Sequence, residues 1–205
     1  MIDELLSKYP LISDQVDKAQ VKVILTELER VLDEGIDGAV VEFGCYIGTT
    51  SLFIRRLLDN RGDSREFHVY DSFEGLPAKT AQDASPAGTQ FQAGELSVGK
   101  KEFTREFQKA GLRPPRIHKA WFDELTDTDV PEKIAFAFLD GDFYESIRDS
   151  LRLVLPRMQP GGTIVIDDYA REALPGAAKA VHDVLPPYLS KQLVTSHNLA
   201  VIRGT

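Results

Sequence analysis

Acidic residues follow three apolar runs of the chain, at the point where each run ends. They are Asp71, Asp140, Asp167 and Asp168, which come directly after 67–70, 134–139 and 161–166. Apolar runs rich in β-branched and aromatic residues are typical of strands buried on both faces. Ligands of an open α/β sheet bind beyond the carboxyl ends of its strands. Carboxylates gathered there repel one another unless a cation or a donor-rich ligand joins them, so the pattern indicates an enzyme site.

Strand-like and helix-like stretches alternate between these residues. Apolar residues at helical spacing predict a helix over 14–32, with Ser13 or Asp14 as its N-cap, and another over 98–110 that Gly111 ends. Further helices are predicted after Gly48, over 147–155 and from Pro175. The predicted strands are 39–43, 67–70, 116–119, 134–139, 163–166 and a closing pair within 193–203, around His197 and Asn198. This alternation predicts an α/β fold with a doubly wound, mainly parallel sheet.

Length and composition set the class of protein. The 205 residues are enough for one well-packed domain, and we expect a single domain over 1–205 in which 1–37 form a helical cover. The formal net charge of −8 argues against a nucleic-acid partner, which needs a basic patch. Cys45 is the only cysteine, so neither an internal disulfide nor a thiolate metal site is expected. No apolar run has membrane-spanning length and the first residues lack the order of a secretory signal, so we expect a cytoplasmic protein.

The segment 72–97 interrupts the alternation. It is rich in Ala, Gly, Pro, Ser, Thr and Gln and has no sustained hydrophobic period. A connection of this length in a compact domain is usually a lid, a binding loop or a disordered insertion. Because it follows Asp71 directly, we interpret it as a lid over the site, with an insertion that has no role as the alternative.

A glycine turn follows the first predicted strand. In the stretch from Glu42 to Gly48, Gly44 lets the backbone approach a ligand, but Tyr46 stands where a dinucleotide loop has its middle glycine. Glu42 disfavours a phosphate and favours a cationic or hydroxyl-bearing ligand such as S-adenosylmethionine. Asp71 stands where a carboxylate accepts both ribose hydroxyls. The sequence of the turn therefore favours S-adenosylmethionine as the cofactor over NAD.

Four blocks of the sequence closely resemble the macrocin O-methyltransferase family. They are Glu42-Phe-Gly-Cys-Tyr-Ile-Gly48, Tyr70-Asp-Ser-Phe-Glu-Gly-Leu-Pro77, Phe138-Leu-Asp-Gly-Asp-Phe-Tyr-Glu-Ser146 and Gly161-Gly-Thr-Ile-Val-Ile-Asp-Asp-Tyr169. The resemblance implies a Rossmann-like class I methyltransferase fold, with a mainly parallel seven-stranded sheet and helices on both faces. It further implies methylation of sugar hydroxyls with S-adenosylmethionine. It also implies that Asp140, Asp167 and Asp168 hold a divalent metal. We expect Mg²⁺, because all of these ligands are oxygens.

The same resemblance assigns roles to single residues. The cofactor-binding residues that it implies are Glu42, Gly44, Tyr46, Gly48, Thr50, Asp71, Ser72, Ala120, Trp121 and Asp140. Catechol-type relatives carry a lysine base three residues after the first metal aspartate, where this chain has Phe143. By resemblance to the sugar methyltransferases, Asp140 takes the acceptor's proton, with Asp142 as the rival base.

The acceptor and the partners are less specified by the sequence. A free sugar, a phenol and a polyhydroxylated natural product are all consistent with the chain, and so is a homo-oligomer. Two other function classes stay open: a nicotinamide-dependent oxidoreductase, and a non-catalytic module that binds S-adenosylmethionine without a metal.

Overall fold

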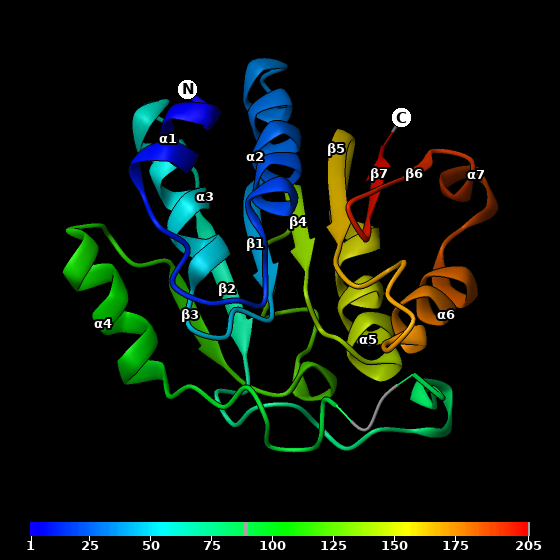
Figure 1. Ribbon diagram of the computed structural model, residues 1–205. Helices are drawn as coiled ribbons and strands as arrows, with labels where there is room; N and C mark the ends of the chain where they lie inside the picture. Colours follow the sequence, from blue (N-terminus) through cyan, green and yellow to red (C-terminus); the bar gives the residue numbers. More distant parts are fainter. Residues whose placement is uncertain (88–89, 205) are drawn as a thin grey trace.

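A computed structural model describes residues 1–87 and 90–204 of the protein (Figure 1). The strands of these residues are β1 (Ala39–Phe43), β2 (Phe67–Asp71), β3 (Arg116–Lys119), β4 (Ile134–Leu139), β5 (Met158–Ile166), β6 (Leu193–Ser196) and β7 (Leu199–Arg203). They form one sheet in the order β3-β2-β1-β4-β5-β7-β6. The first five run parallel, and β7 pairs antiparallel with both β5 and β6. The predicted doubly wound, mainly parallel sheet is therefore confirmed.

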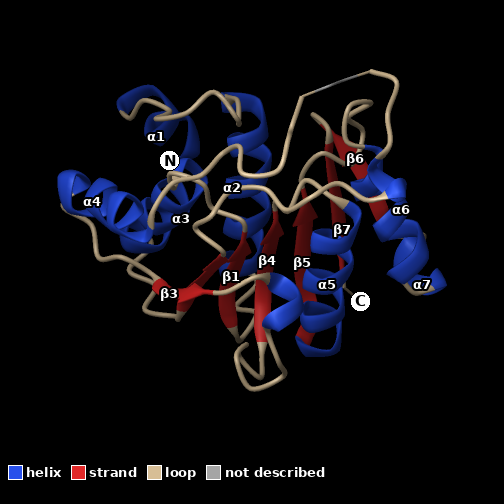
Figure 2. Cartoon of the chain, turned by 90° about the horizontal axis from the view of Figure 1, so that it is seen from below, coloured by secondary structure: helices blue, strands red, loops and turns tan. Residues whose placement is uncertain are grey.

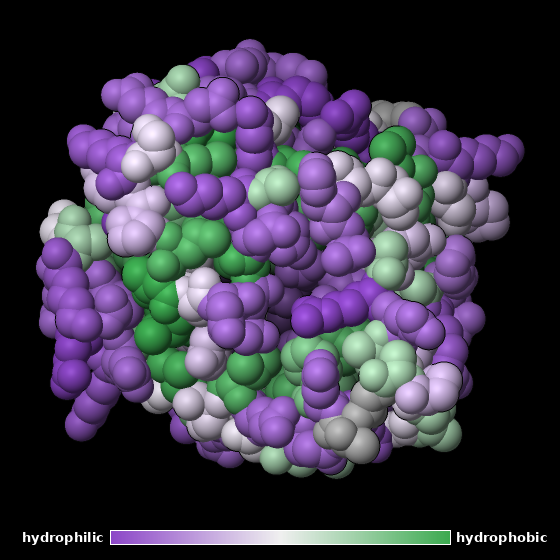
Figure 3. All heavy atoms as spheres, viewed as in Figure 1, coloured by the Kyte–Doolittle hydropathy of each residue, from purple (hydrophilic) through white to green (hydrophobic). Residues whose placement is uncertain are grey.

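Helices cover both faces of the sheet, as Figure 2 shows from below. They are α1 (Ile2–Lys8), α2 (Lys18–Asp33), α3 (Thr49–Asn60), α4 (Lys100–Ala110), α5 (Tyr144–Val154), α6 (Pro175–Val184) and α7 (Pro187–Ser190). Short 3₁₀ helices are η1 (Ala81–Asp83), η2 (Phe122–Glu124) and η3 (Leu155–Arg157). Apart from an apolar area beside α4, the side seen in Figure 3 is mostly hydrophilic, as expected for solvated helices.

Two hydrophobic cores result from the alternation of side chains along the strands. Val40 and Phe138 belong to the core under α1–α4, whereas Val41 and Leu139 belong to the core under α5–α7. Because successive side chains of a strand point to opposite faces, an uninterrupted apolar run such as β4 supplies both cores. All six residues of β4 are buried, which places this strand at the centre of the molecule.

Several predicted boundaries differ from the structure, among them the starts of two helices and of one strand. The helix predicted over 14–32 begins at Lys18, because the Asp17 carboxylate accepts from the backbone N–H of Gln20 and the Gln20 side chain accepts from that of Asp17. This capping box outcompetes Ser13 and Asp14 as the helix start. The helix predicted over 98–110 begins at Lys100, with Gly99 as its N-cap. The strand predicted over 163–166 begins at Met158, which pairs with Ile134 across a register shift in β4.

Candidate active site

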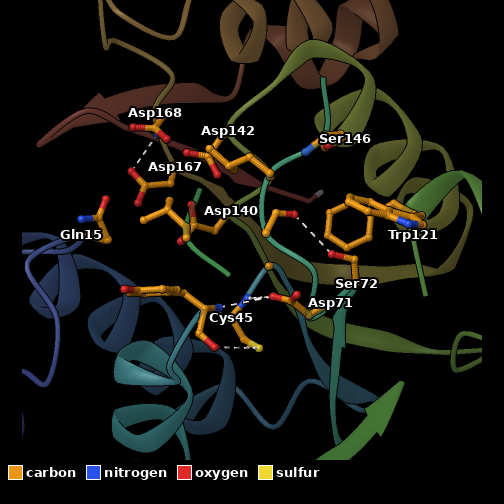
Figure 4. Close-up of a pocket in the computed structure, with 18 of the residues that line it drawn as sticks. Gln15, Cys45, Asp71, Ser72, Trp121, Asp140, Asp142, Ser146, Asp167 and Asp168 are labelled. Atoms are coloured by element: carbon orange, nitrogen blue, oxygen red, sulfur yellow. Dashed lines mark hydrogen bonds between the residues drawn. The ribbon is translucent and has the colours of Figure 1, made fainter. Parts of the chain in front are cut away.

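A cavity lies at the carboxyl ends of β1, β2, β4 and β5, where the acidic residues were expected to meet. It encloses about 750 Å³, part of it open to solvent. Its wall combines the glycine turn after β1, the carboxylates after β2, β4 and β5, and residues of 72–97. Figure 4 shows the aspartates that follow β4 and β5 on one side of the cavity, with Asp71 and Trp121 on the others. Residues far apart in the chain therefore converge on one space.

The glycine turn is shaped by its contact with the loop after β4. The backbone N–H of Asp140 donates to the carbonyl of Phe43 at 2.7 Å. Gly44 has φ +83°, and a Cβ at this position would lie 1.9 Å from the Asp140 carbonyl oxygen. Only glycine fits there, because both the space and the backbone conformation exclude a side chain. Tyr46, with φ 47°, follows in the turn and lines the cavity.

Asp71 fixes this turn from β2. Its Oδ2 accepts from the backbone N–H of Cys45 at 2.8 Å and of Tyr46 at 3.3 Å, and its Oδ1 accepts from that of Phe73 at 2.7 Å. Each carboxylate oxygen has two acceptor positions, so Oδ2 is filled and Oδ1 can still accept from a ligand in the cavity that Asp71 lines. The residue predicted to hold a ribose thus also holds the backbone of the cofactor turn.

Glu42 lies behind the turn and is not among the described residues that line the cavity. Its side chain is buried, and its Oε2 accepts from the Ser51 hydroxyl on α3 at 2.5 Å. Burial, with a smaller contribution from the charge of Asp71, raises the pKa of Glu42 to about 8. A carboxyl group in this position is protonated at neutral pH and links β1 to α3.

Four carboxyl groups lie together at the ends of β4 and β5. Burial and then the charge of Asp167 raise the pKa of Asp140 well above its ordinary range, and burial and then Asp168 do the same for Asp142. Burial, followed by the charge of Asp168, raises the pKa of Asp167 to about 7. The pKa of Asp168 is also raised by burial, against the opposing effect of Arg171. The group therefore favours any ligand that brings positive charge.

Two side chains from other elements hold this group in place. Gln20 on α2 donates from Nε2 to Oδ1 of Asp167 at 3.0 Å, and the backbone N–H of Asp168 donates to the same oxygen at 2.7 Å. Arg171 donates to Oδ1 of Asp168 at 3.1 Å, and its guanidinium lies 4.9 Å from the centre of the Phe91 ring. The carboxylates are thus tied both to the N-terminal helix α2 and to the segment 72–97.

The oxygen donors of this group are of the type that Mg²⁺ prefers. Within residues 1–87 and 90–204, no three His, Cys, Asp or Glu side chains are gathered as a metal-ligand set. The donor chemistry fits a hard divalent cation, whereas the side-chain positions do not converge on one point.

The remaining predicted residues divide into two groups. Ser72 and Trp121 line the cavity, as do Gly44, Tyr46, Asp71, Asp140, Asp167 and Asp168. Of the described residues with a predicted role, Gly48, Thr50 and Ala120 stand behind the wall with Glu42. Gly48 has φ +96° and starts α3 against the Phe103 ring, and Ala120 donates its backbone N–H to the Asp71 carbonyl at 3.1 Å. These residues shape the backbone around the cavity.

Several wall residues were not singled out from the sequence. They are Gln15, Gly75, Leu76, Pro77, Leu96, Phe122, Ser146 and Arg171. The lid interpretation of 72–97 covers four of them by position but does not identify them individually. Gln15 reaches the cavity from the linker before α2. Ser13 attaches this linker to α3 through a hydrogen bond of 2.8 Å between its hydroxyl and that of Thr49. Nothing in the spacing around Gln15 indicates this placement.

Family models and known structures place this site in context. The model of the family described as Macrocin-O-methyltransferase (TylF) matches residues 10–188. The chain belongs to this family. The resemblance seen in the four sequence blocks is therefore confirmed, and all four blocks lie within the matched residues.

Two curated relatives are named as O-methyltransferases of natural products. A tetracenomycin-C 4'-O-methyltransferase of Streptomyces olivaceus, acting on an 8-demethyl-8-(2,3-dimethoxy-alpha-L-rhamnosyl) compound, is 35% identical over 163 residues, which are 76% of this chain and 61% of that protein. A mycinamicin III 3''-O-methyltransferase of Micromonospora griseorubida is 32% identical over 167 residues, which are 76% of this chain and 63% of that protein. The chain thus spans about three fifths of the length of these relatives.

Solved structures agree on the fold. The O-methyltransferase NovP matches with a TM-score of 0.79 at 25% identity, over 93% of this chain and 81% of that one. The calicheamicin methyltransferase CalS11 matches with a TM-score of 0.73 at 18% identity, over 98% of this chain and 89% of that one. The fold is that of the class I methyltransferases, as expected from the sequence. None of the helices in the described part of the chain has the length and apolar character needed to traverse a bilayer.

Proposed function

We propose that the protein is an S-adenosylmethionine-dependent O-methyltransferase that methylates a hydroxyl of a small molecule, a sugar or another natural product. The observation that carries this proposal is the cluster of four carboxyl groups, those of Asp140, Asp142, Asp167 and Asp168, opposite a glycine turn in one cavity. Burial, and then the negative charge of the neighbouring carboxylates, raises their pKa values, so the ionised group carries an excess of negative charge. S-adenosylmethionine carries a positive sulfonium and a positive ammonium, which would relieve that excess.

The cofactor would lie across the glycine turn. Asp71 would accept from a ribose hydroxyl through Oδ1, Tyr46 would contact the amino-acid end, and Trp121 would cover the adenine, since all three line the cavity. Gly44 would let the backbone come close, because no Cβ fits there. Glu42, Gly48, Thr50 and Ala120 would act indirectly by holding the turn and its flanks.

Methyl transfer would proceed by in-line displacement. The acceptor oxygen forms a bond to the methyl carbon while the S–CH₃ bond breaks, and the electron pair of the broken bond stays on sulfur. The proton of the acceptor hydroxyl passes to a carboxylate. Asp140 is our candidate for that base, because it lines the cavity beside the turn and burial holds its pKa well above the ordinary range of an aspartate. Asp142, 2 residues further on in the sequence, is the alternative base.

A divalent cation belongs to the same proposal: its charge would draw together the side chains of Asp140, Asp167 and Asp168, which are not gathered as a ligand set without it. When bound, Mg²⁺ would lower the pKa of the acceptor hydroxyl. The support is the oxygen-only donor set and the mutual repulsion of its carboxylates.

The acceptor would be a small neutral or hydroxyl-rich molecule in the cytoplasm. Leu76, Pro77 and Leu96 of the segment 72–97 would shield it from water, since they form part of the cavity wall. This role for the segment rests on its described residues, 72–87 and 90–97.

Formation of S-adenosylhomocysteine tests the proposal directly. The protein is incubated with S-adenosylmethionine and Mg²⁺ and a panel of rhamnosides, free sugars and catechols, and the product is quantified by mass spectrometry. We expect acceptor-dependent formation of S-adenosylhomocysteine and an acceptor heavier by one methylene. Binding of S-adenosylmethionine without turnover on any hydroxyl compound would favour a non-catalytic module, and binding of NAD in its place would favour an oxidoreductase.

A further inference from the structure

Asp83 joins the segment 72–97 to the two helices beside the cavity. It belongs to η1 and its side chain is 1% exposed, although it comes from a segment with many exposed polar residues. Its Oδ1 accepts from the backbone N–H of Tyr144 at 2.7 Å, at the first residue of α5. Its Oδ2 accepts from the backbone N–H of Thr80 at 2.9 Å and from the Thr80 hydroxyl at 2.8 Å. Both oxygens of a buried carboxylate are thus satisfied, which the burial of a charge requires.

Gly176 leaves the space that this carboxylate occupies. A Cβ at Gly176, in the first turn of α6, would lie 1.9 Å from Asp83 Oδ1 and 2.7 Å from the Tyr144 nitrogen. A glycine inside a helix costs about 1 kcal/mol relative to alanine, so its presence here needs a reason such as this close approach. Carboxylates are also favoured near helix N-termini, and Asp83 lies at those of α5 and α6 together.

Further contacts attach the same part of the segment. Lys179 on α6 donates to the carbonyl of Gln82 at 2.5 Å, and the Ser85 hydroxyl donates to the carbonyl of Glu172 at 2.8 Å. Leu76 and Phe91 of the segment pack with Phe143 and Leu174 in a small buried cluster. The short teal helix η1 lies next to α6 in Figure 1. The segment is therefore attached at its middle, with cavity-lining residues on both sides of the attachment.

We propose that Asp83 is a positioning residue for cofactor binding, and the proposal rests on the function proposed above. By fixing the middle of the segment to α5 and α6, Asp83 holds Leu76, Pro77 and Leu96 in the cavity wall. Through Tyr144 it also fixes the loop of Asp140 to Phe143, which leads into α5. The sequence-based interpretation of 72–97 as a lid is thereby refined: its centre is a fixed anchor, and its two flanks form the wall.

Asp83→Asn tests this assignment with little change of shape. An asparagine accepts through one oxygen only, so its NH₂ would face the N–H and hydroxyl of Thr80 as a third donor. We expect the dissociation constant for S-adenosylhomocysteine, measured by calorimetry at 25 °C without acceptor or metal, to rise about tenfold because the wall is then formed only part of the time. Gly176→Ala, which pushes on the same carboxylate, should have a similar effect. Because both act on one contact, the double variant should be no weaker than the weaker single variant.

Asp123→Asn is the matched control. Asp123 lines a neighbouring cavity together with Asp83 but is exposed, so its substitution should leave the affinity unchanged. A merely structural role of Asp83 would lower the melting temperature without changing affinity at 25 °C. Unchanged affinity of Asp83→Asn, or multiplying effects of the two substitutions, would overturn the assignment. Failure of the wild-type protein to bind S-adenosylhomocysteine would instead overturn the proposed function.

Discussion

Substitution of Glu42 by glutamine should change how the stability of the protein depends on pH. Burial and the charge of Asp71 raise the pKa of Glu42 to about 8, against 4.5 for an ordinary glutamate. The native state therefore holds a proton that the unfolded chain releases. The stability that Glu42 contributes is complete below about pH 4.5 and is lost as the pH rises through about 8.

The size of the effect follows from these two pKa values. If the unfolded chain has the ordinary value, the contribution falls by about 3 kcal/mol between about pH 5.5 and pH 8, as an upper limit. Glutamine keeps an oxygen that can accept from the Ser51 hydroxyl but has no titrating proton. Its second amide hydrogen costs stability, but this cost is the same at every pH. The difference between the two proteins, followed over pH, thus isolates the titration of Glu42.

Urea denaturation, followed by the fluorescence of Trp121, measures the effect. We expect the free energy of unfolding of Glu42→Gln, relative to that of the wild type, to increase as the pH rises. Substitution of the exposed Glu132 by glutamine is the control and should give a curve parallel to the wild type. If the curves of Glu42→Gln and wild type are also parallel, to within about 0.5 kcal/mol, Glu42 titrates normally and the argument from burial is wrong.

Three further perturbations address the site. Asp71→Ala removes the acceptor of three backbone N–H groups and the proposed acceptor of a ribose hydroxyl. Calorimetry should therefore show that S-adenosylhomocysteine binding is weaker by about 1.5–3 kcal/mol, and an unchanged affinity would contradict the ribose assignment. Asp140→Asn should lower the rate of methyl transfer by about 100-fold or more while S-adenosylhomocysteine still binds, whereas Asp142→Asn would show the larger loss if Asp142 were the base. Chelation by EDTA should abolish turnover and Mg²⁺ should restore it; full activity after exhaustive dialysis against chelator would remove the metal from the proposal.

Much of the sheet could be predicted because its strands carry strong local signals. The run 134–139 is apolar at every position, and the structure buries all six residues. The strands 39–43 and 116–119 were predicted with the bounds that the structure has. The start of α2 was placed too early because Ser13 and Asp14 are both good caps. The choice of Asp17 depends on a reciprocal bond with Gln20, and Gln20 is also tied to Asp167 by tertiary structure.

The site was predictable only where a residue follows a strand. Asp71, Asp140, Asp167 and Asp168 were found because parallel strands end at one edge of the sheet. Glu42 lies within β1 between Val41 and Phe43, which face α5–α7, so alternation directs it to the opposite face and toward Ser51. Gln15 and Arg171 come from loops whose paths depend on contacts far away in the sequence, and no local pattern indicates them.

The cavity gathers features that a sequence selected for stability alone would avoid. Tyr46, Phe73, Asp142 and Asp168 all have positive φ, between 47° and 58°, and all lie in or beside the cavity wall. Such conformations cost about 1–3 kcal/mol each and persist only where the surroundings impose them. Asp142 and Asp168 add to this the repulsion between neighbouring carboxylates. The central strands are apolar and buried, so backbone strain and excess charge coincide at one edge of an otherwise consistent sheet. That coincidence is expected where a protein binds a cationic ligand, because the ligand then supplies the stabilising charge that the free protein lacks.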